Sequence, residues 1–379
     1  MRRYLRPQTD VPAVEDWSTA LILKENRAFA PIAFAISVSF AAVASCVAIF
    51  LPGSPGNVAT VVVLGALSVL TSLSVVAAVV ESAPARRGRL NSPWRRCSAT
   101  VAAPMPDNPW FQRLLVFDEP GTLVLRGTSL EGALDLVLDQ QELFLCGPDE
   151  EGRAIIRVPG LCQLYHARVD PLLEAADVRP MEREPAVSSR PLDDPAVAHA
   201  FRYFRWGTRQ WVFPVIPGAV GCALVGLSIR PLAIAGLVTG GLLLLAAGIA
   251  TSLLALAPLY RQAVDRLEAA TEWTTVPFTL FPWEPAQEVA GLAQLPGGGM
   301  ALVQFPFPNS VLIANIADTG TLWVAGSLTD QAVAVGIPRI TVLSLALVQP
   351  DRDTPDDKPQ PWLLRGNEPS LRRIPVLNR

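Results

Sequence analysis

Four long apolar stretches, grouped in two pairs, dominate the hydrophobic pattern of the chain. The first pair is Ala28–Leu51 and Val58–Val80, and the second pair is Trp211–Ile229 and Pro231–Leu259. None of the four stretches contains Asp, Glu, Lys or Arg. A helix rises about 1.5 Å per residue, so each stretch is long enough to cross a hydrocarbon core of about 30 Å. The pattern therefore predicts four transmembrane helices arranged as two hairpins.

Each pair is followed by a region of short apolar runs separated by turn residues. Runs rich in Val, Leu, Ile and Phe, with Gly and Pro between them, are typical of antiparallel strands. The expected strands of the first region are Leu114–Phe117, Thr122–Leu125, Leu134–Leu138, Glu142–Cys146 and Ala154–Val158. Those of the second are Ala301–Phe305, Val311–Ile316, Thr321–Ala325, Ala332–Gly336 and Ile340–Val348. We expect a short helix at Pro171–Ala176 to close the first region.

The fold class that follows is membrane α plus β, with each transmembrane hairpin followed by a small antiparallel β domain. The expected segments are a leader (1–27), hairpin 1 (28–81), β domain 1 (94–178), a Pro-rich linker (179–200), hairpin 2 (201–260), β domain 2 (272–349) and a mobile tail (350–379). In the leader, Trp17, Leu21 and Leu23 favour either a short helix lying on the membrane surface or an ordinary helical lead-in.

The two halves of the chain also match in sequence. Shifting the chain by 179 residues aligns Glu142–Pro171 with Thr321–Pro350 without a gap, and Leu143 then meets Leu322 and Gly147 meets Gly326. The order of elements is the same in both halves. We therefore interpret the chain as a tandem duplication.

Composition supports a membrane protein and argues against a nucleic-acid partner. Half of the residues (50%) are hydrophobic, only 17% are charged, and the net charge is −3. A domain-wide basic surface, which nucleic acid requires, is therefore not expected. The five cysteines form no CxxC pair, so a reducing compartment is expected for the polar parts. Because nearly all basic residues are Arg and because Ala, Pro and Gly are abundant, we expect a bacterial source.

The arginines predict which side of the membrane each segment occupies. They flank the apolar pairs on the side of the β domains. We expect these arginines, with two tryptophans, to form the membrane interface: Arg86, Arg87, Arg89, Arg95, Arg96, Arg202, Arg205, Trp206, Arg209 and Trp211. By the positive-inside rule, both termini and both β domains are cytoplasmic in a bacterial inner membrane. Arg86–Arg96 would contact anionic headgroups. Gly236 and Gly240, spaced as GxxxG, predict close helix packing.

The segment Thr321-Leu322-Trp323-Val324 with Val335–Ile340 resembles a strand–turn–strand of bacterial membrane proteins that carry a PH-like domain. These proteins share the layout of a hairpin followed by a small cytoplasmic β domain. The pattern departs in spacing, because Ile337-Pro338-Arg339-Ile340 is one residue shorter. The resemblance implies a domain that binds proteins or the membrane surface, and it brings no catalytic residue.

The sequence shows no catalytic or cofactor-binding motif. It contains no Walker loop, no Gly-x-Gly-x-x-Gly, no nucleophile elbow and no spacing typical of zinc ligands. We therefore expect no enzyme activity, no catalytic residue, no metal and no cofactor. The preferred hypothesis is a scaffold or assembly subunit that binds other membrane protein subunits. The alternative is a transporter or lipid-handling subunit with a site between the hairpins, lined by Ser68, Thr71, Ser72 and Ser74. A membrane enzyme is a third reading.

Overall fold

The computed structural model describes most of the 379-residue chain. The described ranges are 4–50, 55–102, 112–118, 121–127, 131–170, 178–181, 190–210, 212–229, 234–281, 283, 289–295, 298–328 and 331–350. They divide into two compact units. One unit contains the leader and both β domains, and the other contains Asn26–Ser82 and Arg205–Arg261.

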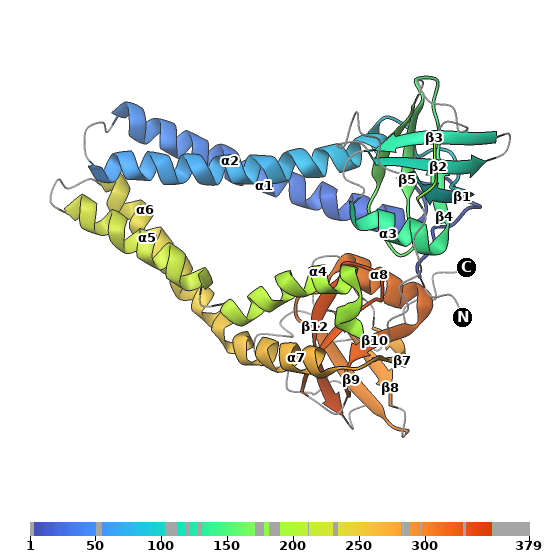
Figure 1. Ribbon diagram of the computed structural model, residues 1–379. Helices are drawn as coiled ribbons and strands as arrows, with labels where there is room; N and C mark the ends of the chain where they lie inside the picture. The colour runs from blue at the N-terminus through green and yellow to red at the C-terminus, as the bar shows by residue number, and fades with distance from the viewer. Residues whose placement is uncertain are drawn as a thin grey trace. The chain divides into compact units, whose positions relative to one another are not determined.

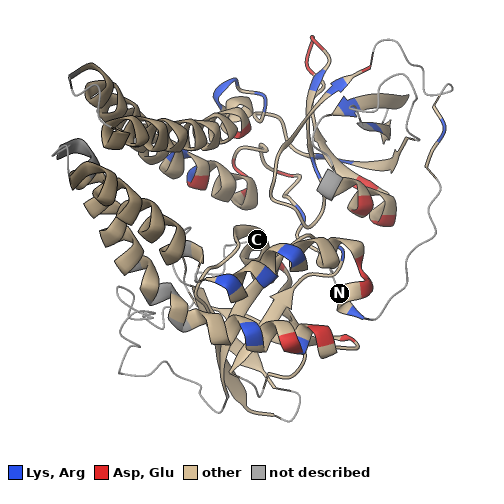
Figure 2. Cartoon of the chain, turned by 60° about the vertical axis from the view of Figure 1, so that its left-hand side comes forward, with Lys and Arg blue, Asp and Glu red and all other residues tan. Residues whose placement is uncertain are grey.

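Helices α1 (Trp17–Phe50) and α2 (Pro55–Arg86) are long enough and apolar enough to cross a membrane (Figure 1). Many of their apolar side chains are exposed, including Ile32, Val62 and Leu73 at 62–66%. Exposure of large apolar side chains along a whole helix is unfavourable in water and favourable in lipid. Charged residues are confined to the ends of these helices that lead into the β domains (Figure 2). The two expected spans of hairpin 1 are thus confirmed as helices compatible with membrane insertion.

The second helical pair is more broken than the sequence predicts. Its elements are α4 (Pro195–Phe204), the 3-10 helix η3 (Arg205–Arg209), α5 (Val212–Ile229), α6 (Ile234–Ala250), the 3-10 helix η4 (Thr251–Leu256) and α7 (Ala257–Ala269). A third span results if the helices on either side of residue 211 are taken as one bent span. The apolar part of α6 is a shorter helix. Over the described residues, two helices are long and apolar enough to span a membrane, or three if the bent pair is one span, so the four expected spans are not all shown.

Part of the expected linker is structured. Helix α4 begins at Pro195, inside the range 179–200, and its Val197 and Phe204 are buried. Residues 182–189 of the linker, the expected helix Pro171–Ala176 and the tail after residue 350 lie outside the described residues.

The first β domain is a closed antiparallel barrel of six strands. The strands are β1 (Arg95–Val101), β2 (Gln112–Asp118), β3 (Gly121–Gly127), β4 (Glu142–Cys146), β5 (Arg153–Arg157) and β6 (Tyr165–Val169), in the order β1-β2-β3-β6-β5-β4. Helix α3 (Glu131–Gln140) connects β3 to β4. Alternate apolar side chains of the strands, such as Leu114 and Val116 of β2, fill the barrel.

The second β domain repeats this arrangement. Its strands are β7 (Trp273–Leu280), β8 (Val289–Gln294), β9 (Met300–Phe305), β10 (Thr321–Ala325), β11 (Ala332–Gly336) and β12 (Leu343–Pro350), with α8 (Ser310–Thr319) between β9 and β10. The order β10-β11-β12-β9-β8-β7 is the order of the first barrel with each strand replaced by its counterpart. Adding 179 to the bounds of α3, β4 and β5 gives the bounds of α8, β10 and β11.

Two of the expected strands are wrong, because both segments are helices. Leu134–Leu138 lies in α3 and Val311–Ile316 lies in α8. In α3 the fully buried side chains are Ala133, Leu136 and Val137, a spacing of three and four that one face of a helix produces. Helix α8 has a clear start and stop in the sequence. The side chain of Asn309 accepts hydrogen bonds from the backbone at its first turn, and Gly320 adopts the left-handed conformation at its end.

Candidate functional site

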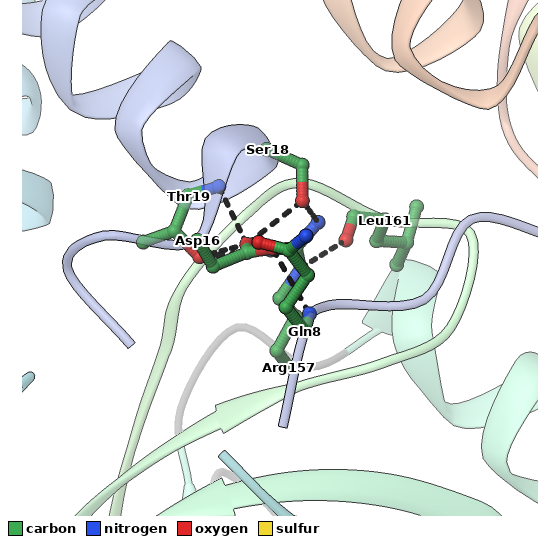
Figure 3. Close-up of polar contacts among 6 residues, drawn as sticks. All are labelled: Gln8, Asp16, Ser18, Thr19, Arg157 and Leu161. Atoms are coloured by element: carbon green, nitrogen blue, oxygen red, sulfur yellow. Dashed lines mark hydrogen bonds and ion pairs between the residues drawn. The ribbon is translucent and has the colours of Figure 1, made fainter. Parts of the chain in front are cut away.

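A buried ion pair joins the leader to the first barrel. Arg157, at the end of β5, donates from Nη1 to Oδ2 of Asp16 at 2.7 Å, and both side chains are 0% exposed. Figure 3 shows the two side chains meeting below the start of α1, with Ser18 and Thr19 beside them. We call the contact of Asp16 with Arg157 the first clamp.

The hydrogen-bonding groups around the first clamp are fully used. Asp16 is the N-cap of α1, accepting from the backbone N–H of Thr19 at 2.9 Å and from that of Gln8 at 3.0 Å. The hydroxyls of Ser18 and Thr19 donate to Asp16 and accept from Arg157, which also donates to the carbonyl of Leu161 at 3.0 Å. A buried charge pair is tolerated only when its remaining donors and acceptors are satisfied. The cluster therefore holds the start of α1 against the end of β5.

The second half of the chain has a related contact. Asp194 precedes α4 and accepts from the backbone N–H of Ala196 at 3.0 Å, as a helix cap does. Its other oxygen accepts from the backbone N–H of Arg339 at 2.6 Å, and the Arg339 guanidinium lies 4.0 Å away. Arg339 follows β11, as Arg157 ends β5. We call this contact of Asp194 with Arg339 the second clamp.

The two barrels touch each other through matching elements. From the second barrel, Arg339 reaches Asp139 of α3 at 3.1 Å. From the first barrel, the carbonyl of Gly160, in the loop after β5, accepts from the Asn315 side chain of α8 at 2.7 Å. Each barrel thus offers the loop after its fifth strand to the helix of the other. Such reciprocity is the mark of an isologous contact, here within one chain.

The leader lies in the same contact. Leu5 donates its backbone N–H to Oδ1 of Asn315 at 2.9 Å and accepts from the backbone N–H of Gly160 at 2.8 Å. Trp17 and Leu21 pack against the cluster of Leu5, Cys162 and Ala314. Leu23 is 2% exposed and belongs to a separate core cluster. The apolar side chains of the leader therefore pack against the protein, which favours the ordinary helical lead-in.

The arginines expected after α2 surround one side of the first barrel. Arg86 and Arg87 are exposed, whereas Arg89 is half-buried and lies 3.6 Å from Asp149. Arg95 donates to the carbonyl of Gly147. Arg96 pairs with Glu142 at 2.8 Å, an oxygen that it shares with Arg6 of the leader. Arg87 and Arg89 thus line one pocket and Arg96 lines another, and carboxylates engage Arg89 and Arg96.

The residues expected before the third span lie on α4 and η3. Arg202 and Arg205 are exposed, and Trp206 is 57% exposed. The guanidinium of Arg209 lies 5.7 Å from the centre of the Trp206 ring, within the range of a cation–π contact. Trp211 lies outside the described residues.

The two hairpins pair in different ways. In hairpin 1, the Ser37 hydroxyl lies 2.7 Å from that of Ser72 and exchanges hydrogen bonds with Ser68. Thr71 and Ser74 instead bond carbonyls of their own helix. In hairpin 2, a Cβ added to Gly240 of α6 would meet the carbonyl oxygen of Gly221 in α5 at 2.8 Å. Gly236 also lies in α6, at a position whose packing is not described.

The buried thiols of the first barrel are poor nucleophiles. Burial raises the pKa of Cys162 to about 11 and also raises the pKa of Cys146, whose Sγ lies 3.0 Å from the carbonyl of Arg89. Both thiols therefore stay protonated near neutral pH, where thiolate reactivity needs a lowered pKa. Across the described ranges, no group of three or more His, Cys, Asp or Glu side chains is placed to hold a metal ion.

Comparison with protein-family models, with curated proteins and with solved structures found no match for this chain. The residues that join the parts of the molecule, Asp16 and Arg157, were not among those expected from the sequence. The signal for Asp16 was present, because Asp16-Trp17-Ser18-Thr19 is a typical N-cap sequence before an apolar helix. Arg157 ends the apolar run of β5, and nothing in the sequence around it indicates that Asp16 is its partner.

Proposed function

We propose that the chain is a non-enzymatic integral membrane scaffold or assembly subunit, which holds other membrane protein subunits through its two β barrels. The proposal rests on one observation: the buried polar groups serve to join parts of the protein to one another. The fully buried ion pair between Asp16 and Arg157, and the buried Asn315, are consumed in joining the leader and the two barrels. In an enzyme, groups of this kind would be expected to face a cleft.

The finer architecture belongs to this proposal. We propose that Pro231–Leu259, the stretch that contains α6 and η4, is a fourth span, so that both hairpins enter from the same side. We also propose that the chain is a tandem duplication. The common strand order and the shift of 179 residues between α3 and α8 support it. Both barrels are then cytoplasmic in a bacterial inner membrane, and the PH-like resemblance remains a hypothesis for how they bind proteins or the membrane surface.

The experiment for the scaffold function is capture of partners from native membranes. The tagged full-length chain is extracted in a mild detergent, and the mass and composition of its complex are measured before and after crosslinking. We expect a complex larger than the chain alone that contains the same membrane proteins in both samples. A chain that elutes alone in both, and that supports solute or lipid flux in vesicles, would replace the scaffold by the transport alternative.

The side of the membrane is tested separately by cysteine labelling. Glu151 and Glu272 are exposed, one beside each barrel, so Glu151→Cys and Glu272→Cys in a background free of other cysteines report on both. With a maleimide that does not cross membranes, both positions should react only after permeabilisation. Labelling of either position in intact cells would contradict the proposed topology.

A further inference from the structure

A pocket of about 420 Å³ opens where α2 runs into the first barrel. Its lining includes Arg87, Arg89, Ser92, Cys146, Asp149 and Arg153. Three guanidinium groups face one carboxylate among these side chains, so the lining carries an excess of positive charge. We call this site the arginine pocket.

Asp149 orients two of the arginines and leaves donors of Arg89 for a further anion. Its Oδ2 accepts from Nε of Arg153 at 2.9 Å and lies 3.6 Å from Nε of Arg89. The backbone N–H of Arg153, at 2.8 Å, is the main cause that lowers the pKa of Asp149, so this carboxyl is ionised at neutral pH. Nη1 of Arg153 is also paired with Glu151, whereas the only ion pair of Arg89 with a described residue is its Nε contact with Asp149. A guanidinium has five N–H donors, so Arg89 keeps donors for a further anion.

The third arginine is unengaged. Arg87 is exposed, and its guanidinium makes no hydrogen bond or ion pair with any residue that the structure describes, whereas its backbone N–H donates to the carbonyl of Ala83 at 3.1 Å. It directly follows Arg86, the last residue of α2. Planar guanidinium groups bind phosphate oxygens in pairs of parallel hydrogen bonds, which makes arginine well suited to phosphate recognition.

The second barrel shows that this barrel fold does not require such a pocket. With the shift of 179 residues, Arg89 corresponds to Glu268, Asp149 to Leu328 and Arg153 to Ala332. Leu328 and Ala332 are buried at 4% and 0% exposure. Arg266, the counterpart of Arg87, donates a hydrogen bond to the carbonyl of Ala332. The equivalent place is therefore filled by apolar side chains and by an arginine that already has a partner.

We propose that the arginine pocket binds the phosphate group of an anionic ligand, and that the phosphate is supplied by an anionic lipid headgroup at the end of α2. The lipid source rests on the proposed function, since it needs α2 to cross a membrane. The phosphate chemistry rests on the pocket alone. Arg87 and Arg89 supply the hydrogen bonds, and Asp149 keeps Arg89 and Arg153 in place.

The test measures binding to the full-length chain in a neutral detergent by titration calorimetry. The probes are dihexanoyl phosphatidate, dihexanoyl phosphatidylcholine, glycerol 3-phosphate and inorganic phosphate. The variants are Arg87→Gln and Arg89→Gln. Arg86→Gln is the matched control, because it removes the same charge one residue away but does not line the pocket. A thermal unfolding scan of each variant shows that it is folded.

We expect phosphatidate to bind, phosphatidylcholine to bind much more weakly, and Arg87→Gln and Arg89→Gln each to weaken phosphatidate binding about tenfold, as loss of a charge-assisted hydrogen bond does. Arg86→Gln should change it less than about twofold, since exposed charges act weakly.

Equal losses in Arg86→Gln and Arg87→Gln, or no binding of any probe, would overturn the proposal. Glycerol 3-phosphate or inorganic phosphate binding as tightly as phosphatidate would overturn the lipid source. Because the assay needs no membrane and no partner, its failure is distinct from failure of the labelling or capture experiments.

Discussion

The first and second clamps place an aspartate before the lead-in helix of each half and an arginine after the fifth strand of the matching barrel. They differ in solvent exposure. Asp16 and Arg157 are both 0% exposed, whereas the side chains of Asp194 and Arg339 are 10% and 19% exposed. The first clamp is sealed by the leader, but Arg339 divides its contacts between Asp194 and Asp139 of the other barrel. The same layout can therefore serve as a buried fixed point in one half and as a shared surface contact in the other.

The hairpins differ in the same way. Hairpin 1 pairs through hydroxyl groups, with Ser37 bonded to Ser68 and Ser72, whereas hairpin 2 pairs by close approach of backbones at Gly221 and Gly240. Small residues and interhelical hydrogen bonds are the two main means of helix association in lipid. The two helical pairs thus use different contact chemistry to hold their helices together.

The largest effect should come from the first clamp. Arg157→Met leaves the carboxylate of Asp16 buried without its cation, and we expect a loss of about 3–5 kcal/mol in the free energy of unfolding. The matched change Arg339→Met should cost less, about 1–2 kcal/mol, because the Arg339 guanidinium lies 4.0 Å from Asp194 and the backbone hydrogen bond between the two residues is kept. Denaturation of the full-length chain in detergent measures both.

A double variant separates charge from packing at the first clamp. Asp16→Asn keeps a side chain that can cap α1, so Asp16→Asn with Arg157→Met should be more stable than Arg157→Met alone. If Arg157→Met and Arg339→Met cost the same, the difference between the clamps described above is wrong.

The contact between the barrels should show the next largest effect. Asn315→Ala removes the partners of the Leu5 N–H and the Gly160 carbonyl, both in a buried place, and we expect a loss of about 1–3 kcal/mol. Gln294→Ala, an exposed position of β8, is the control and should stay within about 0.5 kcal/mol of the original chain. Hydrogen exchange of α8 should rise in Asn315→Ala only, and unchanged exchange would show that Asn315 does not hold the contact.

In hairpin 2, two adjacent glycines give a matched pair. Gly240→Ala forces a Cβ toward the Gly221 carbonyl, which should cost about 1–3 kcal/mol through overpacking. Gly241→Ala meets no atom within 4 Å and should cost less than about 0.5 kcal/mol. Thermal unfolding in detergent distinguishes them, and equal midpoints would remove Gly240 from the helix contact.

The smallest effect is expected at Arg339 itself. This residue has a φ of 67°, and its counterpart in the first barrel, Gly160, has a φ of 88°. Arg339→Gly removes the weak ion pairs but also relieves a left-handed conformation that costs a residue with a Cβ about 1 kcal/mol. We expect Arg339→Gly to be at least as stable as Arg339→Met by thermal unfolding. A lower midpoint for the glycine variant would show that backbone strain is not significant there.

The sequence predicts well what depends on long uniform patterns. The apolar runs that became α1 and α2 carry no charge, and the strands Thr321–Ala325 and Ala332–Gly336 have the expected bounds. It failed at Leu134–Leu138 and Val311–Ile316, where a short apolar run suits a strand or a buried helix equally. The caps at Asn309 and Gly320 would have decided the second case.

The residues that join the leader to the first barrel could not be predicted from such patterns. Asp16 and Arg157 are 141 residues apart, and no local pattern connects them. Likewise, Asp149 pairs with Arg153 nearby but also with Arg89 across the start of the barrel, so the arginine pocket exists only after folding. From the sequence, the arginines after α2 were expected as a group to contact lipid headgroups. Which of them already have a carboxylate partner depends on the fold.

The reciprocal contact between Gly160 with α8 and Arg339 with α3 has one further consequence. Two separate chains in contact in this way would form a homodimer, and the fraction of dimer would depend on protein concentration. Because both partners are tethered in one polypeptide, their encounter is intramolecular and occurs at a high effective concentration. Contact between the two barrels then does not depend on protein concentration, and a substitution in one barrel leaves the sequence of the other unchanged.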